Sequence, residues 1–279
     1  MEIVVADNAG FCFGVERALE MVTRGEEPID APIYTLGPLI HNPQVVERLR
    51  RQGVRQVSSL DEVSGGTVVI PSHGVGPAVQ RQARERGLRL LDATCPFVAR
   101  AQDHARALAA EGYQVVILGD KGHPEVAGLV GAAGEQAVVI EHEDELAAVR
   151  VGARVGLVTQ TTQATARLAA VAGALAERSR ELRAFNTICA ATTQRQESAL
   201  RLAQQVEVMV VVGGKNSANT NRLRQLCEQT GVKTYHVETA AELDPRWFRN
   251  VGRVGVAAGA STPNWLIDEV VQALRGMGG

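Results

Sequence analysis

Long hydrophobic runs are missing from this sequence: no apolar stretch in its 279 residues approaches the roughly 18 residues that a membrane-spanning helix requires. An excess of charge is also missing, since 29 Lys and Arg residues face 31 Asp and Glu residues. Without a basic surface and without a membrane span, we expect neither nucleic acid nor a membrane as a partner. Glu2 and Asp7 stand where a signal peptide would be basic, so the expected location is the cytoplasm.

Cysteine is scarce, and four residues in a chain of this length do not make a disulfide scaffold. Three of them, Cys12, Cys95 and Cys189, each follow a short apolar run and precede a helical pattern. Their spacings are 95 − 12 = 83 and 189 − 95 = 94, and 279 − 189 = 90 residues follow the last. These near-equal intervals predict three similar units, each presenting one thiol at a shared point.

Within each unit, runs rich in Val and Ile alternate with amphipathic helical patterns. Continuous apolar runs are typical of parallel strands buried on both faces. The repeat is too long for a solenoid unit of about 20 to 50 residues. We therefore predict an α/β protein of three similar small domains with mostly parallel sheets, arranged pseudo-threefold around a central axis. The expected domains are residues 1–96, which include the N-terminal strand, 97–190 and 191–279.

The expected elements follow the same order in each unit. Three strands lead directly to the three cysteines, a helix follows Cys12, and Pro28 ends that helical region. The other expected strands are 33–37, 54–57, 67–70, 114–119, 137–140, 154–158, 208–212, 233–237 and 253–256. The other expected helices are 44–51, 78–86, 98–110, 165–178, 194–205, 222–229 and 264–275.

Polar residues follow the strands at recurring positions. The loops after the first strand of each unit can be aligned on their glycines, Gly37, Gly119 and Gly213. The residues four positions after these glycines are His41, His123 and Ser217. The residues six positions after them are Pro43, Glu125 and Asn219. The loops after a later strand supply His73, Thr161 and Ser261. Ligands of open α/β sheets bind outside the carboxyl ends of the strands. With Lys215 nearby, this set suits an anionic oxygen ligand such as a phosphate.

Each of these residues also has a purely structural interpretation. Ser217, Thr161, Ser261 and Asn219 could be helix N-caps, which taken singly is the commoner role. His41 and His73 could be structural hydrogen-bonding groups, and Glu125 could be a first-turn helix carboxylate. Recurrence in three units favours a shared site over separate structural roles.

The thiols allow more than one interpretation. Cys227 shares an apolar helical face with Leu223 and Leu226, as an inert buried cysteine would. The other three cysteines precede helices, and a helix N-terminus favours the thiolate. Three thiolates leave a metal centre with one open position. We interpret them as ligands of an iron–sulfur cluster, with a three-cysteine zinc site as the competing possibility, because no C-x-x-C run decides between them.

At these residues the sequence resembles the LytB-type family of 4-hydroxy-3-methylbut-2-enyl diphosphate reductases, iron–sulfur enzymes of the non-mevalonate isoprenoid pathway. One departure is Ala218, where many members have a second serine. The matching segments span nearly the whole chain in the order of the family: Gly10-Phe11-Cys12-Phe13-Gly14-Val15, His41-Asn42, Ser72-His73-Gly74-Val75, Asp92-Ala93-Thr94-Cys95-Pro96, Gly122-His123-Pro124-Glu125-Val126, Thr159-Gln160-Thr161-Thr162, Ile188-Cys189, Lys215-Asn216-Ser217 with Asn219, and Gly259-Ala260-Ser261.

The resemblance implies three α/β domains around a [4Fe–4S] cluster held by Cys12, Cys95 and Cys189, with one iron open to the substrate. The implied reaction removes the substrate hydroxyl reductively and gives isopentenyl and dimethylallyl diphosphates. Glu125 is the implied proton donor, and its proton is relayed through Thr161 and the diphosphate. The implied electron source is ferredoxin or flavodoxin. The implied diphosphate ligands are His41, His73, Ser217, Asn219 and Ser261, and His123 binds the diphosphate or joins the proton network.

Two hypotheses from other classes remain open. A phosphometabolite-binding protein without catalysis would explain the polar loops but not three cysteines in register. A zinc hydrolase would use Glu125 as its base. Anaerobic purification separates them: a brown protein with iron and sulfide supports the reductase, a colourless zinc protein the hydrolase, and a metal-free protein the binding protein.

Overall fold

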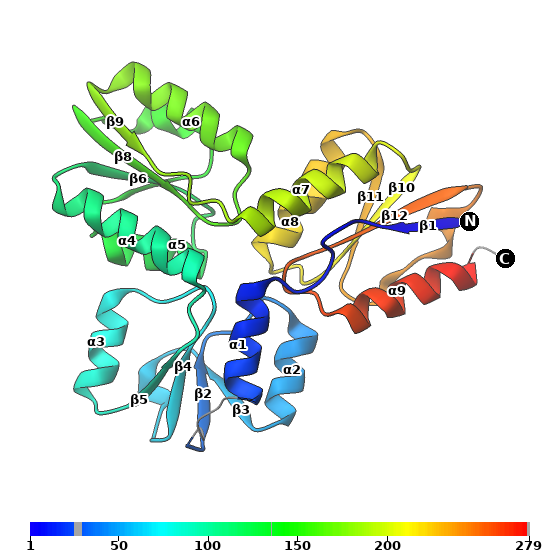
Figure 1. The fold of residues 1–279 in the computed structure, drawn as a ribbon, viewed down its shortest axis with the longest axis horizontal. Coiled ribbons are helices and arrows are strands. Elements are labelled where there is room, and N and C mark those ends of the chain that lie inside the picture. Colours follow the sequence, from blue (N-terminus) through cyan, green and yellow to red (C-terminus); the bar gives the residue numbers. More distant parts are fainter. Residues whose placement is uncertain (25–29, 135, 278–279) are drawn as a thin grey trace. The chain divides into compact units, whose positions relative to one another are not determined.

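The structure is a computed structural model that describes residues 1–24, 30–134 and 136–277, so Pro28 lies outside the described residues. Its strands form three four-stranded sheets, in the orders β3-β2-β4-β5, β7-β6-β8-β9 and β1-β12-β10-β11, and the paired strands run parallel (Figure 1). The α/β class and the parallel sheets are therefore confirmed. The strands are β1 (Glu2–Val5), β2 (Ile33–Leu36), β3 (Val54–Val57), β4 (Thr67–Ile70), β5 (Arg89–Asp92), β6 (Gln114–Leu118), β7 (Val138–Ile140), β8 (Arg154–Thr159), β9 (Glu181–Ala184), β10 (Val208–Val212), β11 (Lys233–Val237) and β12 (Arg253–Ala258).

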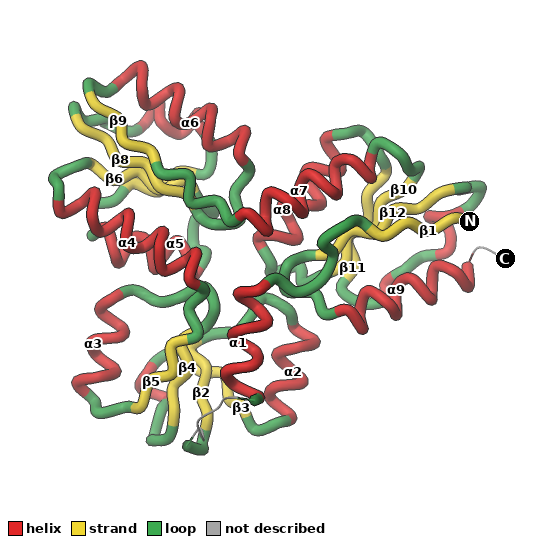
Figure 2. Tube along the Cα trace, in the orientation of Figure 1, coloured by secondary structure: helices red, strands yellow, loops and turns green. Residues whose placement is uncertain are grey.

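Helices connect the strands, as a parallel sheet requires. Figure 2 shows them alternating with strands along the whole trace. Where the structure describes the chain, no helix is both long and apolar enough to cross a membrane. The α-helices are α1 (Phe13–Thr23), α2 (Pro43–Arg51), α3 (Pro77–Glu85), α4 (Pro96–Ala110), α5 (Pro124–Ala133), α6 (Thr165–Arg178), α7 (Ala190–Ala203), α8 (Ala218–Gln229) and α9 (Asn264–Met277), and short 3-10 helices cover η1 (Leu60–Glu62), η2 (Glu143–Ala148), η3 (Ala240–Glu242) and η4 (Pro245–Phe248).

The central strands are apolar because both of their faces are covered. Along β6, Val115 and Ile117 join the core under α4 and α5, whereas Val116 and Leu118 join the core under α6. Alternate side chains of a strand point to opposite faces, which produces this division. Strand β10 divides in the same way between α9 on one face and α7 with α8 on the other. The continuous Val runs of the sequence are thus explained by two-sided burial.

The chain divides into two compact units. Unit 1 comprises residues 1–15, 41–45 and 190–279, and unit 2 comprises residues 16–40 and 46–189. Strand β1 pairs with β12 in the sheet of unit 1, with Glu2 opposite Arg253. The sequence predicts that the N-terminal strand belongs to the first domain, and this is wrong. Residues 2–5 instead complete the sheet formed by the last third of the chain. The three-domain boundaries otherwise stay a prediction.

Several element boundaries differ from the predicted ones. Helix α5 was not predicted, since it is apolar on all sides and shows no amphipathic pattern. Its glycines permit close packing: a Cβ on Gly128 would lie 2.6 Å from Nε2 of Gln102, and one on Gly131 would lie 3.0 Å from Cα of Gly76. The strands before the cysteines end early, at Val5, Asp92 and Ala184, and helix α7 begins at Ala190 rather than at residue 194.

Candidate active site

Each of the three predicted cysteine ligands lies immediately before a helix, because α1, α4 and α7 begin at the next residue. A single backbone hydrogen bond recurs at all three. The amides of Cys12, Cys95 and Cys189 donate to the carbonyls of Ala260, Ser72 and Thr161, at 3.0, 2.9 and 3.0 Å. In each case the acceptor lies two residues after a central strand, β12, β4 or β8. The repetition inferred from the spacing is therefore present in the backbone.

Side-chain turns separate two of these cysteines from their strands. Oδ1 of Asp92 accepts from the amide of Thr94 at 3.0 Å, and Oδ1 of Asn186 accepts from the amide of Ile188 at 3.1 Å. An Asx turn of this kind satisfies the amide that would continue the strand. This is why the strand ends before the thiol rather than at it.

The loops after the first strands are in register at their glycines but not at their helices. The amides of Gly37, Gly119 and Gly213 donate to equivalent carbonyls on β3, β7 and β11. The capping side chains are then His123, Ser217 and Asn42, whose Oδ1 accepts from the amide of Val45 at 3.0 Å. The first loop is one residue longer than the others.

Asn42, not His41, thus occupies the position of His123 and Ser217. Gln44, rather than Pro43, occupies the position of Glu125 and Asn219. An alignment on the glycines does not select these two polar side chains, because the extra residue lies between Gly37 and the start of α2. The second set of loops shows a similar difference. The amides of Gly74, Gln163 and Thr262 each donate to the carbonyl of the residue just after strand β4, β8 or β12. This register aligns His73 and Ser261 with Thr162, and Thr161 lies one residue earlier.

Glu125 and Thr161 form a buried pair within unit 2. Glu125 is 3% exposed in the first turn of α5, as the structural interpretation expected of its position. Its Oε1 accepts from the amide of Thr161 at 2.6 Å, and its Oε2 accepts from the Thr161 hydroxyl at 2.9 Å. Burial raises the pKa of Glu125 to about 7, against the two bonds from Thr161, which lower it. A carboxyl group of this kind holds a proton near neutral pH and releases it readily.

The three predicted histidines differ in their surroundings. His123 caps α5, and its Nδ1 accepts from the amide of Glu125 at 3.1 Å. The neutral ring therefore has its hydrogen on Nε2. His73 is 5% exposed, and its Nδ1 donates to the carbonyl of Gly74 at 3.1 Å. Burial lowers the pKa of His41 below its usual value.

The remaining predicted ligands lie in unit 1. Ser217 is the N-cap of α8. Of the four residues that the structural interpretation proposed as helix N-caps, Ser217 alone takes this role among the described helices. Ser261 donates through its hydroxyl to the carbonyl of His41 at 3.0 Å. Asn219 is 4% exposed, and neither atom of its amide has a hydrogen-bond partner. A buried amide without a partner costs roughly 1–3 kcal/mol, so this side chain fits a site that a ligand completes.

Other buried polar atoms share this property. Nδ2 of Asn42, Oε1 of Gln44 and Oγ1 of Thr162 are among them and belong to the register positions described above, whereas others, such as Oγ1 of Thr67, lie elsewhere. These three side chains are therefore further candidates for ligand contacts.

Lys215 does not join this set. Its ammonium forms an ion pair with Glu242 at 2.5 Å, and both side chains are partly exposed. Lys121 pairs with Glu145 at the equivalent position of unit 2. Lys215 is therefore a surface residue whose charge is balanced. Cys227 is fully buried in the core under α7 and α8, and burial raises its pKa to about 12, as expected of an inert thiol.

The cysteine set fits an iron–sulfur centre by its chemistry. Cys12, Cys95 and Cys189 are half-buried, and their amides donate to backbone carbonyls. In residues 1–24, 30–134 and 136–277, no group of three or more His, Cys, Asp or Glu side chains is arranged to hold a metal ion. Cys12 belongs to unit 1 and the other two to unit 2, so ligation by all three stays a prediction.

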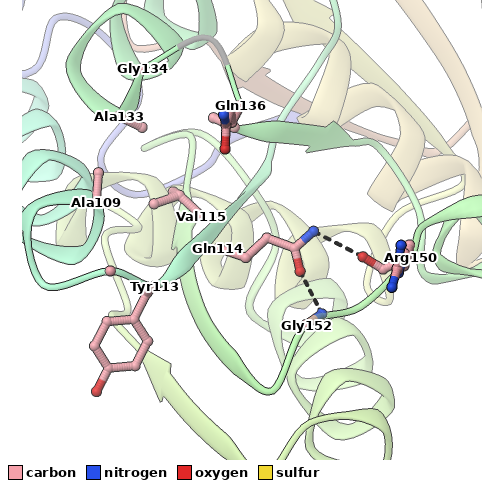
Figure 3. Close-up of a pocket in the computed structure, with 11 residues that line it drawn as sticks. Ala109, Tyr113, Gln114, Val115, Ala133, Gly134, Gln136, Arg150 and Gly152 are labelled. Carbon is pink, nitrogen blue, oxygen red and sulfur yellow. Dashed lines mark hydrogen bonds between the residues drawn. The ribbon is translucent and has the colours of Figure 1, made fainter.

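A cavity of about 670 Å³ lies away from these residues, where β6 begins (Figure 3). Gln114 spans part of it: its amide donates to the carbonyl of Arg150 and accepts from the amide of Gly152. Its polar groups are thus satisfied within the protein. The buried Glu125–Thr161 pair of unit 2 and the unpartnered Asn219 amide of unit 1 lie instead beyond the carboxyl ends of strands, where the ligand sites of α/β enzymes are found.

Comparison with known proteins identifies the family. A family model described as LytB protein matches residues 3–275. The "4-hydroxy-3-methylbut-2-enyl diphosphate reductase" of Geobacter sulfurreducens is 49% identical over 99% of this chain and 97% of its own length. That of Pelobacter propionicus is 48% identical over 97% of this chain and 96% of its own. The chain belongs to the LytB family, as the resemblance predicted.

Solved structures agree. The E-1-hydroxy-2-methyl-but-2-enyl-4-diphosphate reductase from Plasmodium falciparum covers 98% of this chain and 87% of its own, with a TM-score of 0.93 and 27% identity. A structure of (E)-4-hydroxy-3-methyl-but-2-enyl diphosphate reductase, described as the terminal enzyme of the non-mevalonate pathway, covers 99% of this chain and 100% of its own, with 43% identity and a TM-score of 0.69.

Proposed function

We propose that this protein reduces 4-hydroxy-3-methylbut-2-enyl diphosphate to isopentenyl and dimethylallyl diphosphates, using a [4Fe–4S] cluster held by Cys12, Cys95 and Cys189. The observation that carries the proposal is the buried Glu125 carboxyl, with its raised pKa, against the Thr161 hydroxyl. The activity of the relatives supports it, since their names state this substrate.

The reaction replaces an allylic hydroxyl by hydrogen and releases water, so each turnover consumes two electrons and two protons. An external one-electron donor of the ferredoxin or flavodoxin type supplies the electrons. When bound, a cluster with one open iron supplies a Lewis acid for the hydroxyl oxygen and a path for the electrons. The protein must supply the protons and hold the diphosphate.

Of the two protons, Glu125 supplies the one that the leaving hydroxyl oxygen takes up to form water; the other is taken up by the allylic carbon skeleton. Burial raises the pKa of Glu125 to about 7, so the carboxyl still holds a proton near neutral pH. The protonated Oε2 donates to the Thr161 hydroxyl, which then turns its own hydrogen away from Glu125. A leaving oxygen beside Thr161 would accept that hydrogen. The amide of Thr161 holds Oε1 throughout, so the carboxyl plane is fixed while the proton moves.

Neutral polar groups bind the diphosphate. In unit 1 these are His41, Ser217, Asn219 and Ser261, with the first amides of α8 adding the positive end of its dipole; the Ser261 hydroxyl donates to the ligand once it turns away from the carbonyl of His41. In unit 2 they are His123, which donates through Nε2, and His73, which donates only if its bond to the carbonyl of Gly74 is given up and its hydrogen moves to Nε2. The buried amide of Asn219 gains a partner when the ligand arrives, which is a source of affinity that the free protein cannot use.

The test is Glu125→Gln in enzyme reconstituted with iron and sulfide under anaerobic conditions. Gln keeps the shape but holds no transferable proton, so turnover falls by about 10²-fold or more. Iron content, colour and substrate affinity stay normal. Glu143→Gln, at an exposed residue of the same unit, is the matched control and keeps full turnover. Turnover of Glu125→Gln close to that of the control would end the proposed acid role.

Serine replacements test the thiol set. Cys12→Ser, Cys95→Ser and Cys189→Ser should each lose bound iron, whereas Cys227→Ser should retain it because that thiol is buried in a core. Iron and acid-labile sulfide per chain are the measurement. Equal loss in all four variants would discard the three-cysteine assignment, and a colourless protein that binds zinc would support a hydrolase instead.

A further inference from the structure

Arg195 contacts the backbone just before Cys12 and just after Cys189. It lies on α7 with 6% of its surface exposed. Its Nη2 donates to the carbonyl of Gly10 at 2.9 Å, and its Nη1 donates to the carbonyl of Ala191 at 3.0 Å. Gly10 lies two residues before Cys12, and Ala191 lies two residues after Cys189. The second bond lies within α7, so one guanidinium ties the segment before Cys12 to the first turn of the helix that follows Cys189.

Arg17 makes a corresponding contact in unit 2. It lies on α1, five residues after Cys12, and its Nη1 donates to the carbonyl of Thr94 at 3.1 Å. Thr94 is the residue before Cys95. The helix after one cysteine thus reaches the segment before another, as α7 does in unit 1.

The third contact of this kind uses rings instead of a charge. His104 on α4 stacks on Phe185, with ring centroids 4.0 Å apart and an angle of 15° between the planes. Phe185 lies four residues before Cys189. In chain order, the helix after Cys12 contacts the segment of Cys95, the helix after Cys95 contacts that of Cys189, and the helix after Cys189 contacts that of Cys12.

The segment before Cys12 needs such a contact. Gly10 has φ of +110°, a conformation open to glycine, and a Cβ there would lie 2.5 Å from Oδ1 of Asn264. Glycine adds chain flexibility, so other groups must hold the segment in place. The amide of Cys12 is held by Ala260, and the carbonyl of Gly10 is held by Arg195.

We propose that Arg195 and Arg17 are positioning residues: each guanidinium fixes the backbone beside a cluster cysteine and adds positive charge next to an anionic thiolate centre. The charge effect rests on the proposed function, whereas the backbone effect does not. Arginine suits this task because its planar fork can hold two carbonyl oxygens at once, while a lysine keeps the charge but offers a single flexible ammonium.

Hydrogen–deuterium exchange of the metal-free protein tests the backbone effect. Arg195→Gln should speed exchange about tenfold in peptides covering residues 9–13, which corresponds to the loss of one hydrogen bond to a charged group. Peptides covering 93–97 should stay unchanged. Arg17→Gln should give the opposite pattern. Arg201→Gln, an exposed arginine on the same helix as Arg195, should change neither.

A role limited to general stability predicts something different. It would speed exchange throughout unit 1 in Arg195→Gln, and either that result or no change at residues 9–13 overturns the positioning role. If Arg195→Gln does not fold, Arg195→Lys serves in its place and should show a smaller rise at the same peptides. The Arg17 variants make the same test independently.

Redox titration of the reconstituted protein tests the charge effect. Removing a positive charge near an anionic cluster disfavours its reduced form, so the midpoint potential of Arg195→Gln should be more negative than that of the wild type. Arg195→Lys should keep the wild-type potential, since it keeps the charge. An unchanged potential in Arg195→Gln overturns the charge effect. A wild-type protein that takes up no iron refutes the proposed function, and the exchange result stands apart from it.

Discussion

Glu125→Gln should change how the stability of the metal-free protein depends on pH. Burial raises the pKa of Glu125 from 4.5 to about 7, so the folded state binds this proton more tightly than the unfolded state. The resulting stabilisation is complete below pH 4.5, where the group is protonated in both states. It is lost as pH rises from 4.5 through about 7, because the unfolded chain releases the proton first.

The size of the effect follows from the same two values. The difference between 4.5 and about 7, at roughly 1.4 kcal/mol for each tenfold change in proton affinity, corresponds to about 3 kcal/mol. Glutamine has no proton to lose in this range. The wild type should therefore lose about 3 kcal/mol of unfolding free energy relative to Glu125→Gln between pH 4.5 and pH 8.

Urea unfolding at a series of fixed pH values measures this difference. Changes from other titrating groups are shared by the two proteins and cancel in the comparison. Glu143→Gln, at an exposed residue, should track the wild type at every pH. A wild-type-minus-variant difference that stays within about 0.5 kcal/mol over the range would refute the assignment of a raised pKa to this carboxyl.

Three further outcomes are expected. Thr161→Val removes one of the two hydrogen bonds that lower the pKa of Glu125, so the pKa of Glu125 should rise further. In infrared spectra the band of the protonated carboxyl group should therefore persist to higher pH than in the wild type. Loss of this band at a lower pH than in the wild type would contradict the prediction. Gly10→Ala should cost roughly 1–3 kcal/mol in urea unfolding, because alanine is strained at φ of +110°, and an unchanged midpoint would count against this. In native protein Cys227 should react with a thiol reagent far more slowly than Cys95, since it is fully buried; equal rates would place it outside the core.

The sequence predicted the fold well where elements repeat. Strands β3, β4 and β10 and helix α6 coincide with the predicted ranges, because their apolar runs are bounded by polar and glycine residues. Helix α5 was missed because its sequence after Glu125 is apolar on every side and lacks the periodic pattern on which prediction depends. The pairing of β1 with β12 was missed because residues 2–5 resemble the strands of any unit, and their partner lies at the far end of the chain.

The sequence selected candidate site residues, but it aligned the three loops that carry them incorrectly beyond their glycines. The recurring glycines aligned the loops correctly at their start, as the shared amide hydrogen bonds of Gly37, Gly119 and Gly213 confirm. One extra residue before α2 then shifts the alignment, and only the capping bond of Asn42 reveals it. The resemblance implied the proton-donor role of Glu125, but the burial that raises its pKa depends on packing that no local pattern records.

The place of β1 has a consequence for how the protein is made. Glu2 pairs with Arg253, so 253 − 2 = 251 residues separate the two partners along the chain. During translation residues 2–5 leave the ribosome long before β12 does, and their backbone stays unpaired in this sheet until β12 has been made. Domains usually complete themselves in the order of synthesis; here the sheet that holds residues 2–5 cannot close before β12 follows. The amide of Cys12 therefore reaches its acceptor on Ala260 only after residue 260 has been made, which makes late maturation of that thiol a property of the topology.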